Sequence, residues 1–295
     1  LITIFIFALG IVIMGLSFSG KGRNMKSFFA AGGAVPWPMS GLSLFMGFFS
    51  AGTFVVWGSI AYSLGWIAIS IQWTMAIAGF VVGFFIAPRW HKTSALTVAE
   101  YITRRLGVNT QKTYTYLFLF ISLFTTGSFL YPVAKIVEVS TGMPLDLCIL
   151  LLGGFCILYV AAGGLWAVVS TDVLQFIILT AAVLIVVPLS FGRVGGVVNF
   201  IESIPVTYFN LVNGEYTIGF IIAFGVYNAI FLGGNWAYVQ RYASVNSQSS
   251  ARKVGFLFGG LYVVSAVLWM LPPMIYRIVN PSLSAIEAEG AYLMM

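Results

Sequence analysis

Residues 47–54 read GFFSAGTF and lie in the middle of an apolar segment, 37–63, that is long enough to cross a lipid bilayer. Its two glycines and two hydroxyl side chains gain nothing from contact with lipid. Backbone can leave the helical pattern at this depth only where it is buried in protein or lines a cavity. Small residues and hydroxyl groups also favour a close contact between two helices. The stretch therefore predicts either a helix break at a binding site or a tight helix crossing.

The composition of the whole chain indicates a membrane protein with several spans. Of its 295 residues, 7% are charged and 60% are hydrophobic, whereas a soluble domain carries about a quarter charged residues. The net charge of +6 does not indicate a nucleic-acid surface, because the cations cluster in a few short segments between apolar runs. We therefore predict an all-α polytopic protein whose partner is the lipid bilayer and not nucleic acid.

Eight apolar segments have the length of spanning helices. They lie at approximately 1–19, 37–63, 66–87, 113–139, 144–162, 165–190, 217–239 and 254–276. The chain begins without Met inside one apolar run, and its last residues, EGAYLMM, begin another. We therefore expect a fragment of a longer protein.

The basic residues predict the orientation of the spans. If there are eight spans, segments 20–36, 88–112 and 240–253 lie on one side, and they hold eleven of the fourteen Lys and Arg residues. Basic loops stay in the cytoplasm, so we expect a multi-pass protein of the cell (inner) membrane with its N-terminus outside. Within the second basic segment, residues 97–106 (TVAEYITRRL) have the spacing of a short amphipathic helix on the membrane surface.

Polar side chains inside a span are costly and point to function. Gln72 could bind a hydroxylated solute or simply hydrogen-bond to another helix. Asp172 has no basic neighbour in the sequence, and cation coordination, proton transfer or a place at the membrane interface all remain open for it. Asn228 and Asn235 are seven residues apart, which would put them two turns apart on one face of a helix. Lys135 and Glu138 have the spacing of a local ion pair.

The sequence lacks the patterns of an enzyme. It has no zinc motif, P-loop, nucleophile elbow or dinucleotide fingerprint, and its single histidine, His91, lies outside the spans. One isolated acid inside the spans does not form an acid–base pair or a metal cluster. We predict that the protein is not an enzyme.

A family resemblance enters at residues 159–175, YVAAGGLWAVVSTDVLQ. This stretch resembles the signature of the sodium:solute symporter family, whose members include sodium-coupled glucose, proline, pantothenate and sialic acid carriers. Four other stretches are similar to segments of that family, namely residues 50–65, TVAEYITRRLG, QRYASVNSQSSARKVG and EGAYLMM.

The resemblance implies the inverted-repeat fold of the leucine transporter with one extra N-terminal helix and a truncated C-terminus. By this interpretation residues 1–36 form the extra helix and a cytoplasmic loop, and 37–190 form the first five-helix repeat. Residues 191–216 form an outer loop, and 217–295 begin the second repeat with two helices.

The resemblance also implies binding residues for sodium and for a solute. It assigns sodium to the backbone carbonyls of Met46 and Phe49, and a second sodium to Asp172. It assigns the solute to Ser50, Thr53, Gln72, Asn228 and Asn235. Sialic acid carriers hold the substrate carboxylate with an Arg on the helix that corresponds to 113–139, and this chain has no Arg there. An unbalanced carboxylate is costly in the membrane, so we expect a small neutral polar solute such as a sugar or polyol.

We therefore predict a sodium-coupled symporter that imports its solute by alternating access. Two alternatives stay open. The chain could be a transporter-like sensor domain of a signalling protein, or a carrier of the same fold that uses protons in place of sodium.

Overall fold

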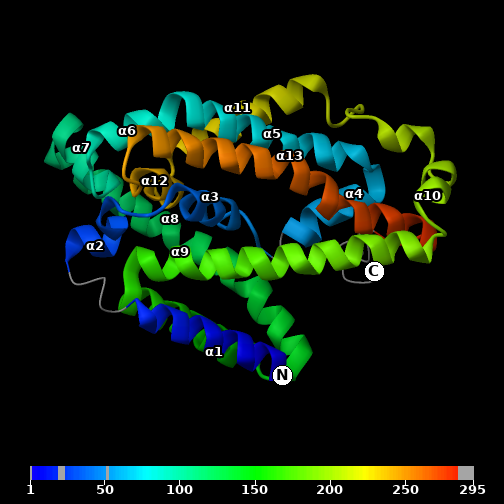
Figure 1. Cartoon of the computed structure of the whole chain (residues 1–295), viewed down its shortest axis with the longest axis horizontal. Helices are drawn as coiled ribbons and strands as arrows, with labels where there is room; N and C mark the ends of the chain where they lie inside the picture. The colour runs from blue at the N-terminus through cyan, green and yellow to red at the C-terminus, as the bar shows by residue number, and fades with distance from the viewer. Residues whose placement is uncertain (1, 19–23, 51–52, 285–295) are drawn as a thin grey trace.

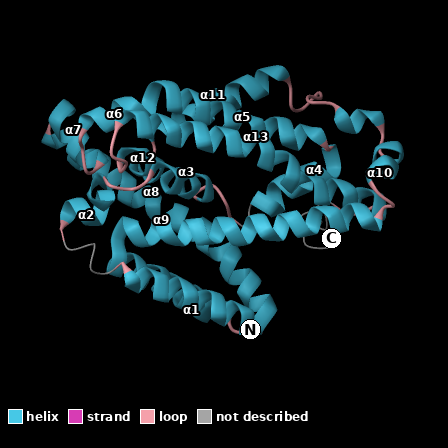
Figure 2. Ribbon diagram, in the orientation of Figure 1, coloured by secondary structure: helices cyan, strands magenta, loops and turns pink. Residues whose placement is uncertain are grey.

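The computed structural model describes residues 2–18, 24–50 and 53–284. These residues are helical almost throughout, as Figure 2 shows, and contain no β-strand beyond one isolated bridge between Val35 and Val245. The final EGAYLMM segment and residues 51–52 of the GFFSAGTF stretch lie outside the described residues. The predicted all-α fold is confirmed.

The helices follow one another along the chain as labelled in Figure 1. The first half contains α1 (Ile2–Ser17), α2 (Met25–Ala30), η2 (Ala31–Gly33), α3 (Trp37–Met46), η3 (Thr53–Trp57), α4 (Gly58–Leu64), α5 (Trp66–Val81), η4 (Val82–Ile86), α6 (Ala87–Thr93) and α7 (Val98–Leu106). The second half contains α8 (Val108–Thr141), α9 (Leu145–Arg193), α10 (Val197–Ser203), η5 (Val206–Phe209), α11 (Ile218–Gly234), α12 (Trp236–Ala243) and α13 (Gln248–Val279).

Four helical stretches of the described chain are long and apolar enough to cross a membrane. They are Trp66–Thr93, Val108–Thr141, Leu145–Arg193 and Gln248–Val279, and α11 with α12 makes a fifth if this bent pair is one span. The eight predicted spans are a finer division than this. Part of the difference lies in α9, where Gly164 has φ 57° and ψ −147° and divides the helix into two stretches. The sequence prediction places a boundary between 162 and 165, at this kink.

The N-terminal helix α1 packs beside the first stretch of α9. A Cβ on Gly15 of α1 would lie 3.0 Å from the Cβ of Tyr159. The two helices can lie this close because a glycine faces the partner helix. Figure 1 shows α1 at the bottom of the view, below the horizontal stretch of α9.

Two glycine pairs bring α13 against α5 and η4. Gly79 and Gly83 on one side, and Gly255 and Gly259 on the other, each have the spacing of a G-x-x-x-G motif. A Cβ on Gly255 would lie 2.5 Å from the Cα of Gly83, and one on Gly79 would lie 2.8 Å from the backbone nitrogen of Gly259. Small residues let helix backbones approach directly in membranes. This crossing was not predicted from the sequence.

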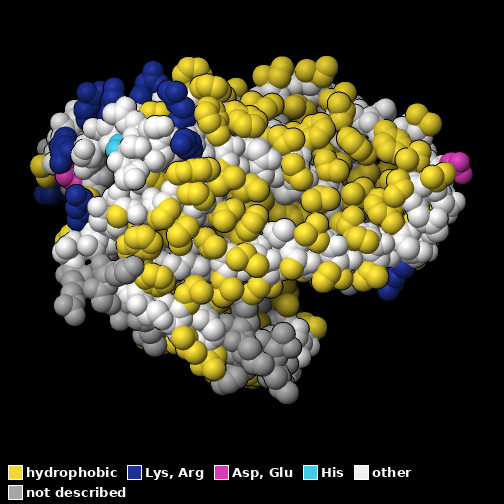
Figure 3. Space-filling view, in the orientation of Figure 1, with side chains coloured by type: hydrophobic (Ala, Val, Ile, Leu, Met, Phe, Trp, Pro, Cys, Tyr) yellow, Lys and Arg dark blue, Asp and Glu magenta, His cyan; other side chains and the backbone are white. Residues whose placement is uncertain are grey.

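One end of the molecule is basic. Figure 3 shows Lys and Arg side chains gathered at the end that carries α2, α6 and α7, with yellow apolar side chains over most of the rest of this face. Residues 97–106 form the predicted helix: the Thr97 hydroxyl caps α7 by accepting from the Glu100 amide at 3.1 Å. We call this end the basic end.

The predicted ion pair of α8 is confirmed. Lys135 Nζ lies 2.5 Å from Glu138 Oε2 on a helix whose side chains are mostly exposed. The pair therefore supports α8 locally and does not reach the helices around α13.

Candidate functional site

The GFFSAGTF stretch is a break between two helical segments. α3 ends at Met46, and the helical pattern resumes at Thr53 as the π-helical turn η3. Thr53 Oγ1 accepts a hydrogen bond from the Ser50 amide and donates one to the Phe48 carbonyl, both at 3.2 Å. One hydroxyl thus satisfies two backbone groups that the break leaves without helical partners. Of the two alternatives that the sequence left open for this stretch, the structure has the helix break.

A cavity of about 150 Å³ lies between η3, α5, α11 and α13. We call it the amide cavity. It is lined by Phe48, Thr53, Trp57, Gln72, Met75, Phe224, Tyr227, Asn228, Phe231 and Tyr262. The fold thus brings together three side chains that the sequence analysis assigned to a solute, Thr53, Gln72 and Asn228, from segments far apart in the chain.

The two carboxamides of the cavity differ in what they already bind. Asn228 Nδ2 donates to Thr74 Oγ1 at 2.8 Å, which leaves the Asn228 carbonyl oxygen as an acceptor. The Gln72 carboxamide is buried, and it makes no hydrogen bond to another described residue. Neutral donors and acceptors, with no charged side chain among the described lining residues, suit a neutral hydroxylated molecule.

Tyr262 of α13 is a cavity residue that the sequence analysis missed. Its side chain is 4% exposed, and it packs against the rings of Phe45 and Phe258 at 5.3 and 4.8 Å between centroids. Its hydroxyl has no hydrogen-bond partner among the described residues although the side chain lines the amide cavity. This hydroxyl is therefore free to donate to a molecule in the cavity. With 14 tyrosines in the sequence, composition alone does not single this one out.

A larger cavity of about 560 Å³ lies on the other side of the helix break. We call it the large cavity. Met46, Phe49 and Ser50 line it together with Arg241 and other residues of α8, α11 and α12. Ser50 therefore lies apart from the amide cavity to which Thr53 contributes. Phe48 and Phe231 line both cavities and separate them.

Asp172 of α9 has two polar partners from other helices. Ser43 Oγ donates to Asp172 Oδ2 at 2.5 Å, and Arg241 Nη2 lies 3.7 Å from the same oxygen. The side chains of Asp172 and Arg241 are 16% and 14% exposed. The sequence analysis counted Arg241 with the loop cations and so found no base for Asp172. The structure instead includes Arg241 in α12, where it balances the buried carboxylate.

Asn235 does not lie on one helix face with Asn228, and that prediction is wrong. α11 ends at Gly234, and α11 and α12 meet at an angle of 62°. Asn235 has extended backbone and its Oδ1 accepts from the Ala237 amide at 3.0 Å, so it is the N-cap of α12. It is absent from the residues that line the amide cavity.

Two hydrogen bonds join the broken helices at the basic end. The Val35 amide donates to the Ser244 carbonyl at 3.2 Å, and Ser40 Oγ donates to the Arg241 carbonyl at 3.1 Å. The start of α3 is thereby tied to the end of α12.

Two broken helices beside cavities with polar side chains are the arrangement in which secondary membrane transporters form their binding sites. The sequence profile described as the sodium:solute symporter family matches residues 28–282. The chain belongs to that family. The resemblance noted in the sequence is confirmed, and the matching relatives are transporters and not enzymes.

The relatives are similar over much of this chain. A sodium/glucose cotransporter of Vibrio parahaemolyticus is 28% identical over 271 residues, which cover 86% of this chain and 50% of that protein. A sodium/myo-inositol cotransporter 2 of Mus musculus is 32% identical over 178 residues, which cover 60% of this chain and 26% of that protein. The chain spans half or less of the length of these relatives.

A solved structure has the same fold. The substrate-bound, outward-open state of a Na+-coupled sialic acid symporter matches with a TM-score of 0.84 and 21% sequence identity, over 99% of this chain and 65% of that one. This likeness supports the fold.

Proposed function

We propose that this chain contains the ion-binding and solute-binding region of a sodium-coupled symporter that imports a small neutral polar solute, of the sugar or polyol class. The observation that carries the proposal is the amide cavity. It combines the neutral polar groups of Thr53, Gln72 and Asn228 with aromatic side chains such as Trp57 and Tyr227. A sugar presents hydroxyl groups to the former and C–H faces to the latter.

The charges around the cavities favour a neutral solute over an acid. Arg241 is the cation that lines the large cavity, and Asp172 balances its charge. A solute carboxylate would have to compete with Asp172 for Arg241, or remain without a cation in a poorly solvated site.

We assign sodium to the large cavity beside the helix break, with the carbonyls of Met46 and Phe49 as ligands. The Met46 carbonyl accepts from the Phe49 amide at 2.9 Å, and a carbonyl oxygen has a second lone pair for a cation. We keep Asp172 as a ligand of a second sodium ion, which must displace Arg241 from the carboxylate to bind there. Ser50 and Asn235 remain proposed solute ligands. Ser50 lies at the helix break and Asn235 at the bend between α11 and α12, so each would contact a solute only as the solute moves past it.

The proposed orientation puts the basic end in the cytoplasm, because Lys and Arg are retained on that side. Sodium and solute would enter from the opposite side. By reciprocity, each would raise the affinity for the other by the same factor.

Uptake into liposomes that contain the full-length protein tests this proposal. Labelled glucose and myo-inositol are compared with labelled sialic acid, each in sodium and in choline at one pH. We expect uptake of a neutral solute that requires sodium and is lost in Gln72→Leu. Equal uptake in sodium and choline would favour the proton-coupled carrier. Binding of a neutral solute without any uptake would favour the sensor domain, and uptake of sialic acid alone would overturn the assignment of a neutral solute.

A further inference from the structure

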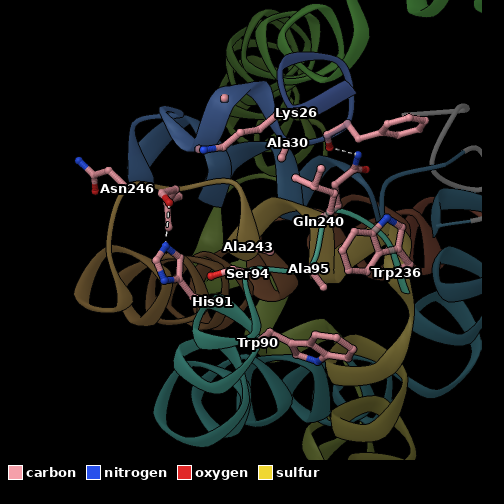
Figure 4. A pocket seen from close by; sticks show the side chains of 15 residues that line it. Lys26, Ala30, Trp90, His91, Ser94, Ala95, Trp236, Gln240, Ala243 and Asn246 are labelled. Atoms are coloured by element: carbon pink, nitrogen blue, oxygen red, sulfur yellow. Dashed lines mark hydrogen bonds between the residues drawn. The ribbon is translucent and has the colours of Figure 1, made fainter. Parts of the chain in front are cut away.

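A third cavity, of about 280 Å³, lies at the basic end and is separate from both cavities of the candidate site. We call it the basic-end pocket. Three parts of the chain form it: α2 with η2, the C-terminal end of α6 with residues 94–96, and α12 with residues 243–246. Figure 4 shows it from close by.

Hydrogen bonds between these three parts fix the walls of the pocket. Gln240 Nε2 donates to the Phe29 carbonyl at 2.5 Å, and His91 Nε2 lies 2.9 Å from the Val245 carbonyl, to which it donates. Both interactions are drawn in Figure 4. Trp90 Nε1 donates to the Gly233 carbonyl at 2.8 Å. The pocket is therefore formed before any ligand arrives, which lowers the entropic cost of binding.

One side of the pocket has polar donors that the protein leaves free. The Lys26 ammonium group makes no hydrogen bond or ion pair with another described residue, and neither does the Ser94 hydroxyl. Asn246 uses its carbonyl oxygen to accept from Ser250, and its NH₂ group remains available. Figure 4 shows Lys26 and Ser94 at the pocket, and Asn246 at its edge with the amide group pointing outward.

The described lining residues include a lysine but no aspartate or glutamate. The nearest acid in sequence, Glu100, is already bonded to Arg104 and to the Leu96 amide. A net positive lining with free N–H and O–H donors favours an anion, and phosphate oxygens accept several such bonds at once.

The other side of the pocket is aromatic. The indoles of Trp90 and Trp236 lie 6.1 Å apart at 72°, and Figure 4 shows both on the side away from Lys26 and Asn246. An inorganic ion would leave this surface without contact. A phosphate ester would meet the donors with its anionic group and the indoles with its carbon skeleton.

We propose that the basic-end pocket binds the phosphate group of a glycerol phosphate ester. The ester comes either from the headgroup of an anionic phospholipid or from a soluble phosphate ester. Lys26 and Ser94 hold the phosphate, and Trp90 and Trp236 contact the glycerol portion. A bound ester would join α2 to the end of α6, and so stabilise the packing of the basic end.

The test uses the full-length protein and two sources of the same chemistry. In the first arm, glycerol 3-phosphate is titrated into the protein in neutral detergent. In the second arm, the protein is placed in nanodiscs of phosphatidylcholine with or without phosphatidylglycerol. The thermal midpoint is measured in both arms, and tryptophan fluorescence gives the affinity. Lys26→Ala removes the proposed cation, Lys26→Arg retains the charge, and Lys92→Ala removes an exposed cation of α6 that does not line the pocket.

We expect the ester to raise the midpoint in at least one arm. Lys26→Ala should weaken binding about fivefold, because one lysine beside an anionic headgroup contributes about that factor to the affinity. Lys26→Arg and Lys92→Ala should leave the affinity close to that of the parent protein. A response in both arms identifies the ester itself as sufficient, and a response in the nanodiscs alone identifies a lipid as the source. The absence of a response in both arms overturns the proposal. Equal weakening by Lys26→Ala and Lys92→Ala also overturns it, because it would indicate diffuse attraction to the whole basic end.

Discussion

The carboxylate of Asp172 on α9 lies 3.7 Å from the guanidinium group of Arg241 on α12, and the two side chains are only 16% and 14% exposed. Ser43 of α3 donates to the same carboxylate oxygen. The three groups connect the two broken helices to α9. Removal of one charge of such a pair leaves the other buried without compensation.

Asp172→Ala should therefore lower the free energy of unfolding by about 3 kcal/mol. Asp172→Asn keeps a hydrogen-bond acceptor for Ser43 and should destabilise the protein less. Thermal unfolding in detergent measures both. Glu138→Gln is the matched control, because its partner Lys135 is on the exposed helix α8 and its loss should change the midpoint little. A shift in Asp172→Ala no larger than in this control would contradict a structural role of the buried pair.

Thr53→Val should damage the helix break, and Thr53→Ser should preserve it. Valine has nearly the shape of threonine but cannot accept from the Ser50 amide or donate to the Phe48 carbonyl. Unpaired backbone groups cost about 1–3 kcal/mol each when buried. Thermal unfolding and solute uptake by the full-length protein should both decline in Thr53→Val. Full stability in this variant would mean that the break holds without the hydroxyl.

Tyr262→Phe and Tyr242→Phe should separate solute binding from stability. Tyr262 lines the amide cavity, and its hydroxyl has no hydrogen-bond partner among the described residues, so Tyr262→Phe should weaken solute binding about tenfold and leave unfolding unchanged. The Tyr242 hydroxyl instead donates to the carbonyls of Leu232 and Gly233 at 3.2 Å, and Tyr242→Phe should lower stability with little change in affinity. Equilibrium binding of the solute and thermal unfolding distinguish the two effects. Identical behaviour of the two variants would show that Tyr262 does not contact the solute.

Gly255→Ala should destabilise the crossing of α13 over α5 and η4. The added Cβ would lie 2.5 Å from the Cα of Gly83, so the backbones must move apart at a cost of about 1–3 kcal/mol. Gly260→Ala on the same helix meets nothing within 4 Å, and alanine there should be neutral or stabilise by up to about 1 kcal/mol. Unfolding of the two variants in detergent provides the comparison. Equal midpoints would exclude a close crossing.

The sequence predicted the features that depend on local chemistry. An apolar stretch interrupted by glycine and hydroxyl groups predicted either a helix break or a tight crossing at 47–54, and the structure has the break. The family resemblance assigned Thr53, Gln72 and Asn228 to a solute, and the structure places all three around the amide cavity. The Lys135–Glu138 pair followed from helical spacing alone. In each case the residues that determine the feature are close together in the sequence, or they are polar side chains whose free-energy cost inside a membrane can be recognised without knowing their partners.

The features that the sequence did not predict depend on which helices meet. The sequence analysis placed Arg241 in a loop between spans. In the structure, the chain bends by 62° after Gly234, and Arg241 on α12 lies beside Asp172. The same bend removes Asn235 from the face that carries Asn228. The environment of Tyr262 depends on how α13 crosses α5, and the hydropathy of one helix does not contain that information.

The bonds from Val35 to Ser244 and from Ser40 to the Arg241 carbonyl have a mechanical consequence. They join the first broken helix to the second, so we expect α3 and α12 to move as one rigid unit. A displacement that starts at the break after Met46 would therefore be transmitted to the bend after Gly234. If the basic end opens during a transport cycle, we expect α3 and α12 to leave their places together.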